Sequence, residues 1–212
     1  MFLREVFLSQ IYHRKVEDAS GRQIGIAEDV VVSLNGECPQ AVGICVSGRC
    51  FLLAMLAGGL AAGVYRLKGL TEYRLQEDDW LIGKLLMDQQ VIDCKRRRVS
   101  LVNDVVFASC GRGEDEQRCC WVGIDVGVRG IARRLRIEWT MRWKTNHFLS
   151  WQDIVMVRRD VPPCLSLDHL TVVSGADVRE ICRKLGHCSR RMFLRQIAGG
   201  SADTSQGEVR YD

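Results

Sequence analysis

A chain of 212 residues is long enough for one large domain or two small ones. Its composition, with 47% hydrophobic and 26% charged residues, is that of an ordinary globular protein and excludes a wholly disordered chain. The formal net charge of +4 arises from 30 basic and 26 acidic residues, and so balanced a chain does not require a polyanionic partner.

The first ten residues, MFLREVFLSQ, lack the apolar core of a secretory leader, since Glu5 interrupts them. A cytoplasmic protein is therefore expected, and its ten cysteines are not expected to form a disulfide framework. No Cys-x-x-Cys pair occurs, so the cysteines do not indicate a zinc site. Four of them lie in apolar patterns and are interpreted as small buried side chains: Cys45, Cys50, Cys120 and Cys182.

The sequence repeats itself. Residues 16–32, VEDASGRQIGIAEDVVV, return as VIDCKRRRVSLVNDVVF at 91–107, a constant offset of 75 positions. After a longer loop, QAVGICV at 40–46 returns as CWVGIDV at 120–126. Two matched blocks in the same order indicate an internal duplication, and they predict equivalent strands in the two copies. We expect the matched valines of both copies to be buried.

Each copy consists of short β-rich runs separated by turn residues, which favours a small antiparallel barrel because closure removes exposed strand edges. An uncharged run, CFLLAMLAGGLAAGVY at 50–65, could be mistaken for a membrane span. As a helix it would rise about 24 Å, which is less than the roughly 30 Å of a hydrocarbon core. We therefore expect no transmembrane segment.

Asp29 and Asp104 occupy equivalent positions before buried valines and could be taken for a symmetric acid pair. The simpler interpretation is that each carboxylate accepts hydrogen bonds from nearby backbone amides. Neither a nucleophile with a base nor a phosphate-binding loop is recognisable. We accordingly predict no catalytic residue, no cofactor and no metal site.

A basic insert at 129–144 combines cationic and aromatic side chains. Ile131, Leu135 and Trp139 recur at helical spacing, so the insert is expected to pack its apolar face on the barrel while its arginines face water. It is the predicted docking surface for a protein partner, and RNA, bound through phosphates and stacking, is the alternative. The candidate docking residues are Arg129, Arg133, Arg134, Arg136, Trp139 and Trp143.

The pattern changes to helical spacing after Pro162-Pro163. In SGADVREICRKLG at 174–186, Val178, Ile181, Cys182 and Leu185 fall on one helical face, and RRMFLRQIA at 190–198 predicts a second helix. The predicted organisation is a first β-barrel repeat at 1–78, a second at 79–162, a helical segment at 163–198 and a disordered tail at 199–212.

LSQIYHRKVEDASGRQIGIAEDVVV with PQAVGICV resembles the PRC-barrel, a module found in the photosynthetic reaction-centre H subunit and the ribosome maturation factor RimM. The second copy and the helical segment resemble the paired PRC-barrels and the start of the N domain in MgtE-type magnesium transporters. The resemblance covers about residues 3–197. It implies a mainly β chain of two tandem PRC-type barrels followed by a short C-terminal helical segment. It also implies a non-enzymatic cytoplasmic adaptor or regulatory protein, associated with magnesium transport through protein–protein contacts.

The chain departs from this family at two points. Gly175 replaces the family's proline before Ala-Asp, and the resemblance does not extend to a CBS pair or a membrane domain, so transport by this chain is not expected. The segment 164–198 carries more cations than acids, whereas Mg²⁺ needs converging carboxylates, and we predict no magnesium site there. In the two predicted helices the basic residues are Arg179, Arg183, Lys184, Arg190, Arg191 and Arg195, against the acids Asp177 and Glu180.

Overall fold

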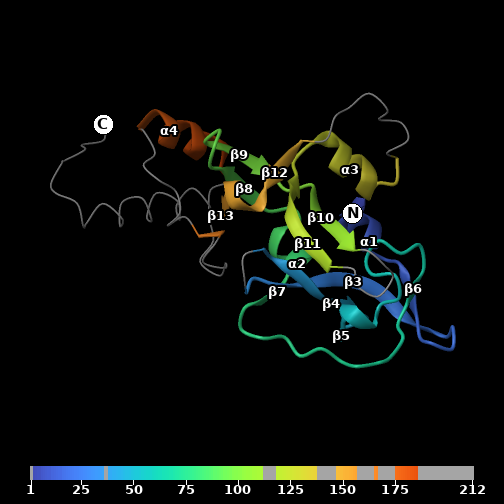
Figure 1. Cartoon of the computed structure of the whole chain (residues 1–212). Helices are drawn as coiled ribbons and strands as arrows, with labels where there is room; N and C mark the ends of the chain where they lie inside the picture. Colours follow the sequence, from blue (N-terminus) through green and yellow to red (C-terminus); the bar gives the residue numbers. More distant parts are fainter. Residues whose placement is uncertain are drawn as a thin grey trace. The chain divides into compact units, whose positions relative to one another are not determined.

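The computed structural model describes residues 2–35, 38–111, 118–137, 147–156, 165–166 and 175–185. Contacts divide the chain into two compact units. Unit 1 comprises Met1–Gln89 and Leu101–Gln152, and unit 2 comprises Gln90–Ser100 and Asp153–Asp212. The prediction of a mainly β chain is confirmed, and the structure adds a few short helices between the strands (Figure 1). The two units do not follow the predicted boundary between residues 78 and 79, because strands of both copies enter unit 1.

The described elements of the first copy come in the order expected from the sequence. They are β1 (Phe2–Phe7), α1 (Leu8–Ile11), β2 (Lys15–Glu17), β3 (Gln23–Ser33), β4 (Gln40–Val46), β5 (Arg49–Leu52), the 3-10 turn η1 (Leu53–Met55) and β6 (Tyr65–Arg66).

The second copy follows a similar order from β7 to η3, with the helix α3 inserted between β11 and β12. Its elements are β7 (Asp79–Leu81), α2 (Ile82–Leu86), β8 (Gln90–Asp93), β9 (Arg98–Leu101), β10 (Asp104–Gly111), β11 (Arg118–Asp125), α3 (Val128–Arg134), β12 (Phe148–Ser150) and η3 (Trp151–Asp153), followed by β13 (Ile154–Met156) and α4 (Gly175–Lys184). The matched segments are strands in both copies, as predicted, although β3 of the first copy corresponds to two strands, β9 and β10, in the second.

The strands of unit 1 form one curled sheet in the order β1-β10-β11-β4-β3-β2-β6, with β12 on β11, β5 on β4 and β7 on β3 (Figure 1). The first strand of each copy lies in the sheet of the other: β1 pairs with β10, and β7 pairs with β3. The copies meet where β4 and β11 touch, with Cys120 opposite Gln40 and the Trp121 N–H donating to the Pro39 carbonyl at 2.9 Å. Each copy therefore contributes its first strand to the sheet of the other.

The matched apolar residues form the core of unit 1. Val30 and Val31 are fully buried, as is Val105, and Val106 is 2% exposed, which confirms the predicted burial for these valines, whereas Val122 of the second matched block is 38% exposed and contradicts it. Trp121 is also fully buried, and its indole N–H donates to the Gly123 carbonyl at 2.8 Å. The duplicated pattern thus specifies the inward side of both copies.

The uncharged run at 50–65 is not helical. It forms β5, η1 and a loop that returns to β6, with Leu53, Leu56 and Leu60 buried and the Tyr65 hydroxyl donating to the Leu60 carbonyl at 2.8 Å. Within the described part of the chain, no helix has the length and apolar character needed to cross a membrane.

Two facing cysteines correct the interpretation of Cys45 and Cys50 as merely small buried side chains. Cys45 in β4 lies directly opposite Cys50 in β5, and their sulfurs form a disulfide bond. The hairpin brings the two residues together, which spacing along the sequence does not reveal. Cys120 and Cys182 are not in disulfide bonds and are only half-buried.

Unit 2 contains the three-stranded sheet β13-β8-β9 and the helix α4. Ile92 and Val155 from the sheet pack with Ile181 of α4 and with Leu185, the residue after this helix, and Val178 and Cys182 pack against this cluster. The predicted apolar face of the helix is therefore confirmed. The predicted boundary at Pro162-Pro163, the second helix at 190–198 and the tail at 199–212 lie outside the described residues.

Candidate docking surface on helix α3

Asp104 of the second copy is part of a polar network in unit 1. It binds the first turn of α1, which belongs to the first copy. Its carboxylate accepts hydrogen bonds from the Ser9 N–H at 3.0 Å and the Ser9 hydroxyl at 2.6 Å. It also accepts the N–H of Val105 at 2.9 Å. Free N–H groups at a helix start need acceptors, and a strand of the second copy supplies one.

Asp29 of the first copy likewise binds the first turn of α2, which belongs to the second copy. Its carboxylate accepts the N–H of Gly83 at 2.8 Å, of Lys84 at 2.9 Å and of Val30 at 2.7 Å. The Ser9 and Lys84 amides occupy equivalent positions of the repeat, as the two aspartates do. The expectation that these aspartates accept backbone hydrogen bonds is confirmed, and the acceptors are exchanged between the copies.

Burial has the same effect on both carboxylates. It raises the pKa of Asp29 and of Asp104 above the usual range, against the opposing effect of the donors around them. Burial also raises the pKa of the Tyr12 hydroxyl, with Asp29 and Asp104 adding to the rise. The arrangement places two carboxyl groups in the interior, where they bind the first turns of two short helices. Because burial raises the pKa of both carboxyl groups, they do not form a pair of one acid and one base.

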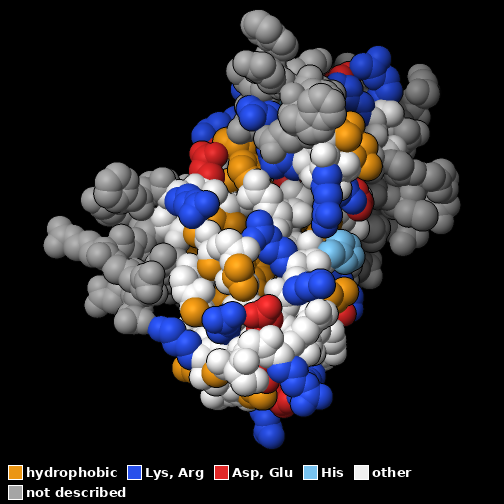
Figure 2. Space-filling view, turned by 90° about the vertical axis from the view of Figure 1, so that its right-hand side faces the viewer, with side chains coloured by type: hydrophobic (Ala, Val, Ile, Leu, Met, Phe, Trp, Pro, Cys, Tyr) orange, Lys and Arg blue, Asp and Glu red, His pale blue; other side chains and the backbone are white. Residues whose placement is uncertain are grey.

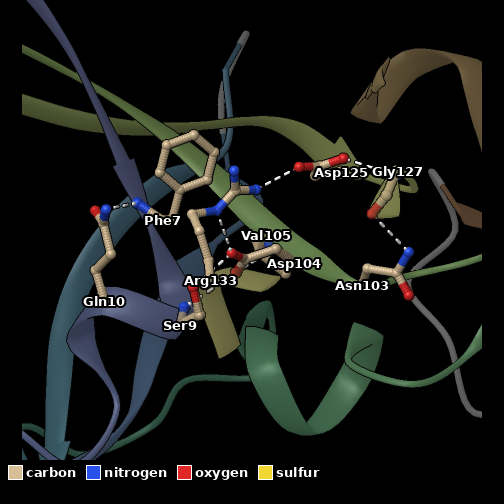
Figure 3. A network of polar contacts seen from close by, with 9 residues as sticks. All are labelled: Phe7, Ser9, Gln10, Asn103, Asp104, Val105, Asp125, Gly127 and Arg133. Atoms are coloured by element: carbon tan, nitrogen blue, oxygen red, sulfur yellow. Dashed lines mark hydrogen bonds and ion pairs between the residues drawn. The ribbon is translucent and has the colours of Figure 1, made fainter. Parts of the chain in front are cut away.

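Arg133 of α3 faces this network (Figure 3). Its Nε donates to Asp104 at 3.0 Å, its Nη2 group donates to Asp125, and its guanidinium carbon lies 3.7 Å from the centre of the Phe7 ring. Asp125 also accepts the Gly127 N–H at 2.8 Å. All three charged side chains are buried. Arg133 therefore anchors α3 to the sheet and does not belong to an exposed docking surface.

The outer side of α3 is apolar, which corrects the predicted orientation of the insert. Val128 is 50% exposed, Ile131 41% and Leu135 63%, and their spacing of three and four places them on one side of the helix. The buried side carries Ala132 and Arg133 instead. Two interior carboxylates attract the arginine inward, and the aliphatic side chains are thereby turned to the surface.

Gly130 allows α3 to approach the sheet closely. A Cβ atom at this position would lie 2.9 Å from the Cβ of Asn103. The Asn103 amide donates to the Gly127 carbonyl at 3.0 Å, so the residue before α3 is tied to the same loop (Figure 3). The helix is held in this orientation by packing as well as by charge.

The remaining predicted docking residues have different surroundings. Arg134 binds both carboxylate oxygens of Asp88, at 2.6 and 2.9 Å, on the surface. Arg129 is half-buried, and Arg136 is exposed. The structure thus places three of the six candidates on the accessible part of α3. Trp139 and Trp143 lie outside the described residues.

A pocket of about 210 Å³ lies between β1 and the loop before β6 and is lined by Arg4, Gln10 and Arg14 among others. The Arg14 guanidinium already donates to the carbonyls of Gln10, Ala62 and Gly63. The Arg14 guanidinium in this pocket therefore supports the fold. In the part of the chain that the structure describes, no three His, Cys, Asp or Glu side chains gather as a metal site would require.

Sequence reasoning missed the role of Arg133, although a signal was present. The repeat aligns VGICV of the first copy with VGIDV of the second, so Asp125 replaces Cys45 in a buried strand. A carboxylate in such a strand requires a cation or several donors. Comparisons of the chain with family models, with curated proteins and with solved structures found no match.

Proposed function

We propose that the protein is a non-enzymatic adaptor or regulatory protein that binds a protein partner through the outer side of α3. The observation that carries the proposal is the exposed row of Val128, Ile131 and Leu135. A surface helix of a globular protein normally turns its apolar side inward. Contiguous apolar exposure of this kind is typical of protein interaction sites.

The orientation of α3 results from interactions in the interior. Arg133 is bound by Asp104 and Asp125 on the buried side, and turning the helix would leave both carboxylates without their cation. Breaking a buried ion pair costs about 3–5 kcal/mol. Burying Val128, Ile131 and Leu135 together would gain about 2–5 kcal/mol, because each is about half exposed and a complete transfer gains about 1.5–3 kcal/mol. Turning the helix would leave two carboxylates without their cation, so its cost is at least as large as this gain. The apolar side consequently stays available to a partner.

Charge indicates the chemistry of that partner. Arg129 and Arg136 lie next to the apolar row in the sequence, and Figure 2 shows one face of the molecule on which blue Lys and Arg side chains lie among orange hydrophobic ones. An amphipathic helix with acidic flanks would match both features, with its apolar residues at i, i+3 or i+4, and i+7. Complementary charge would chiefly speed association and fix the orientation.

The resemblance to PRC-barrels and MgtE-type transporters supports a more specific form of the proposal. In that form the protein acts in the cytoplasm and its partner belongs to the magnesium-transport machinery. The RNA alternative is less well supported, because Arg133 is buried and Arg134 is bound to Asp88. Fewer cations are then left for phosphate contacts.

A photo-cross-linking residue at position 131, compared with one at Leu70, tests the surface. Leu70 is also an exposed apolar residue of unit 1, at 54%, and lies away from α3 in the sequence. A partner captured from native lysate only at position 131 is then purified, and its affinity is measured. We expect Ile131→Glu and Leu135→Glu to weaken binding at least about tenfold, whereas Leu70→Glu leaves it unchanged.

Equal capture at both positions, or equal affinity of all variants, would contradict the docking surface. Nucleic acid recovered with the protein, and lost steeply as salt rises, would favour the RNA alternative. Folding of each variant is checked by its urea unfolding midpoint, since the substituted residues are exposed and the midpoint should not move.

A further inference from the structure

The pocket between β1 and the loop before β6 is lined by both ends of the curled sheet. β1 and β6 are the first and last strands of the strand order, and Val6 of β1 and Tyr65 of β6 both line the pocket. Its volume of about 210 Å³ is room for roughly seven water molecules, since each takes about 30 Å³. The space is therefore large enough for a small ligand.

Arg14 is a fixed cation in the wall of this pocket. Its Nε donates to the Gln10 carbonyl at 2.7 Å, and its Nη1 donates to the carbonyls of Ala62 at 3.2 Å and Gly63 at 2.7 Å. The guanidinium carbon also lies 5.4 Å from the centre of the Tyr65 ring. Among the described residues, no carboxylate pairs with this guanidinium and no acceptor is bound to its Nη2, which carries further N–H donors. Arg14 is thus pre-organised, and part of its donor capacity is left for a ligand.

Arg4 and Gln10 add further donors to the same pocket. Side chains alternate along β1, whose register with β10 is regular, so Arg4 and Val6 lie on one side of the strand and Glu5 on the other. Arg4 is exposed, and in the part of the chain that the structure describes it takes part in no hydrogen bond or ion pair. The Gln10 side-chain oxygen accepts the Phe7 N–H at 3.5 Å, which leaves its NH₂ group as a donor. The pocket therefore combines positive charge with N–H donors from several side chains.

We propose that this pocket binds a phosphate group, carried by inorganic phosphate or by a small phosphomonoester. One guanidinium is enough for the two oxygens of a planar carboxylate, whereas donors from three side chains suit an anion with more oxygens. The volume of about 210 Å³ excludes larger ligands, because pockets for drug-sized molecules span about 300–1,000 Å³. No lining residue belongs to α3, so this site does not rest on the proposed function.

The test titrates the isotopically labelled full chain with sodium phosphate and follows its amide chemical shifts, with sodium chloride at equal ionic strength as the reference. We expect saturable changes on the amides of β1 and of residues 60–63, with a dissociation constant of about 0.1–1 mM, as is reasonable for so small a ligand. Arg4→Gln should weaken binding at least about threefold, because it removes a charge-assisted contact. Glu5→Gln is the matched control on the other side of the strand and should not weaken binding.

Ala61, a half-buried residue of the pocket, tests the space without a change of charge. Ala61→Leu should abolish the saturable changes, while an unmoved urea midpoint shows that the variant is folded. Glycerol 3-phosphate separates the two sources of the phosphate group. If it binds at least as tightly as inorganic phosphate, the ligand is a phosphomonoester, and if it binds more weakly, the ligand is inorganic phosphate.

Three results would overturn the proposal. They are the absence of saturation up to about 10 mM phosphate, which is well above the expected dissociation constant, equal shifts with chloride, and equal phosphate affinity of Arg4→Gln and the unaltered chain. The last comparison remains decisive if Ala61→Leu fails to fold, because Arg4 is exposed and its replacement should leave the urea midpoint unchanged.

Discussion

At the scale of single residues, Arg133 is the cation that stabilises the buried carboxylates of the second copy. It binds Asp104 and Asp125, which are fully buried. The equivalent aspartate of the first copy, Asp29, has only amide donors. The buried carboxylate of the first copy is thus bound by backbone amides, whereas those of the second copy are also bound by a cation.

Replacing Arg133 with leucine should lower the free energy of unfolding by about 3–5 kcal/mol, because two buried carboxylates lose their cation. Urea denaturation measures the change. Arg134→Leu is the matched control, since its ion pair with Asp88 is on the surface and such a pair contributes about 0–1 kcal/mol. Equal losses in the two variants would mean that the buried network contributes nothing beyond a surface pair.

Asp29 gives a prediction with a definite sign in pH. Burial raises its pKa in the folded state, so its contribution to stability is fully present below the unfolded pKa and is lost as pH rises through the folded pKa. An asparagine cannot ionise. Relative to the unaltered protein, Asp29→Asn should therefore gain stability between pH 4 and pH 7, as measured by urea unfolding at both values.

Asp18 is a control in which the pH dependence of stability has the opposite sign. Hydrogen bonds from Ser20 hold its pKa below the usual range, so its contribution is present above the unfolded pKa and is lost as pH falls through the folded pKa. As pH rises, the stability of Asp18→Asn should accordingly fall relative to that of the unaltered protein. If both variants shift in the same direction, burial does not govern Asp29.

At the scale of elements, the Val-Gly-Ile motif of both copies has a packing reason. Gly123 of β11 faces Ser150 of β12, and Gly43 of β4 faces Leu52 of β5. A Cβ atom on Gly123 would collide with the Leu149 carbonyl oxygen and lie 3.0 Å from its carbon. The strand partners can approach only because neither position has a side chain.

Gly123→Ala should destabilise the protein by about 1–3 kcal/mol, because the colliding atoms belong to the backbone and cannot rotate away. The thermal unfolding midpoint measures this loss. Gly63→Ala is the control, since nothing lies within 4 Å of a Cβ atom built there. An unchanged midpoint for Gly123→Ala would show that β12 does not pack on β11 at this distance.

At the scale of the whole molecule, exchange between the copies makes unit 1 a single cooperative structure. β1 lies in the sheet of the second copy, β7 lies in that of the first, and the amides of α1 and α2 are bound by aspartates of the opposite copy. A separated copy would expose a strand edge and leave a buried carboxylate without its donors.

We therefore expect the fragments 1–78 and 79–212 to remain without a cooperative unfolding transition when alone and to regain one when mixed. Near-ultraviolet circular dichroism at equimolar concentration measures the recovery, because the signal reports tertiary packing around aromatic side chains such as Trp121. Cooperative unfolding of fragment 1–78 by itself would show that the first copy is an independent barrel.

Much of the local structure could be predicted from sequence. Alternation and the repeat indicated the strands and the buried valines such as Val105, and the spacing of Ile181 and Leu185 indicated the apolar side of α4. These features follow from side-chain periodicity, which is a local property. The backbone role of Asp29 and Asp104 followed in the same way, because their position before buried strands allows few other uses.

The tertiary structure decided the rest. Which copy each first strand joins, and whether Cys45 meets Cys50, depend on contacts that spacing along the chain does not encode. The orientation of α3 was decided by energy: periodicity alone favours burying Ile131, whereas two carboxylates from β10 and β11 draw Arg133 inward. Burying unpaired charges costs more than exposing aliphatic side chains, and only the folded sheet brings those charges together.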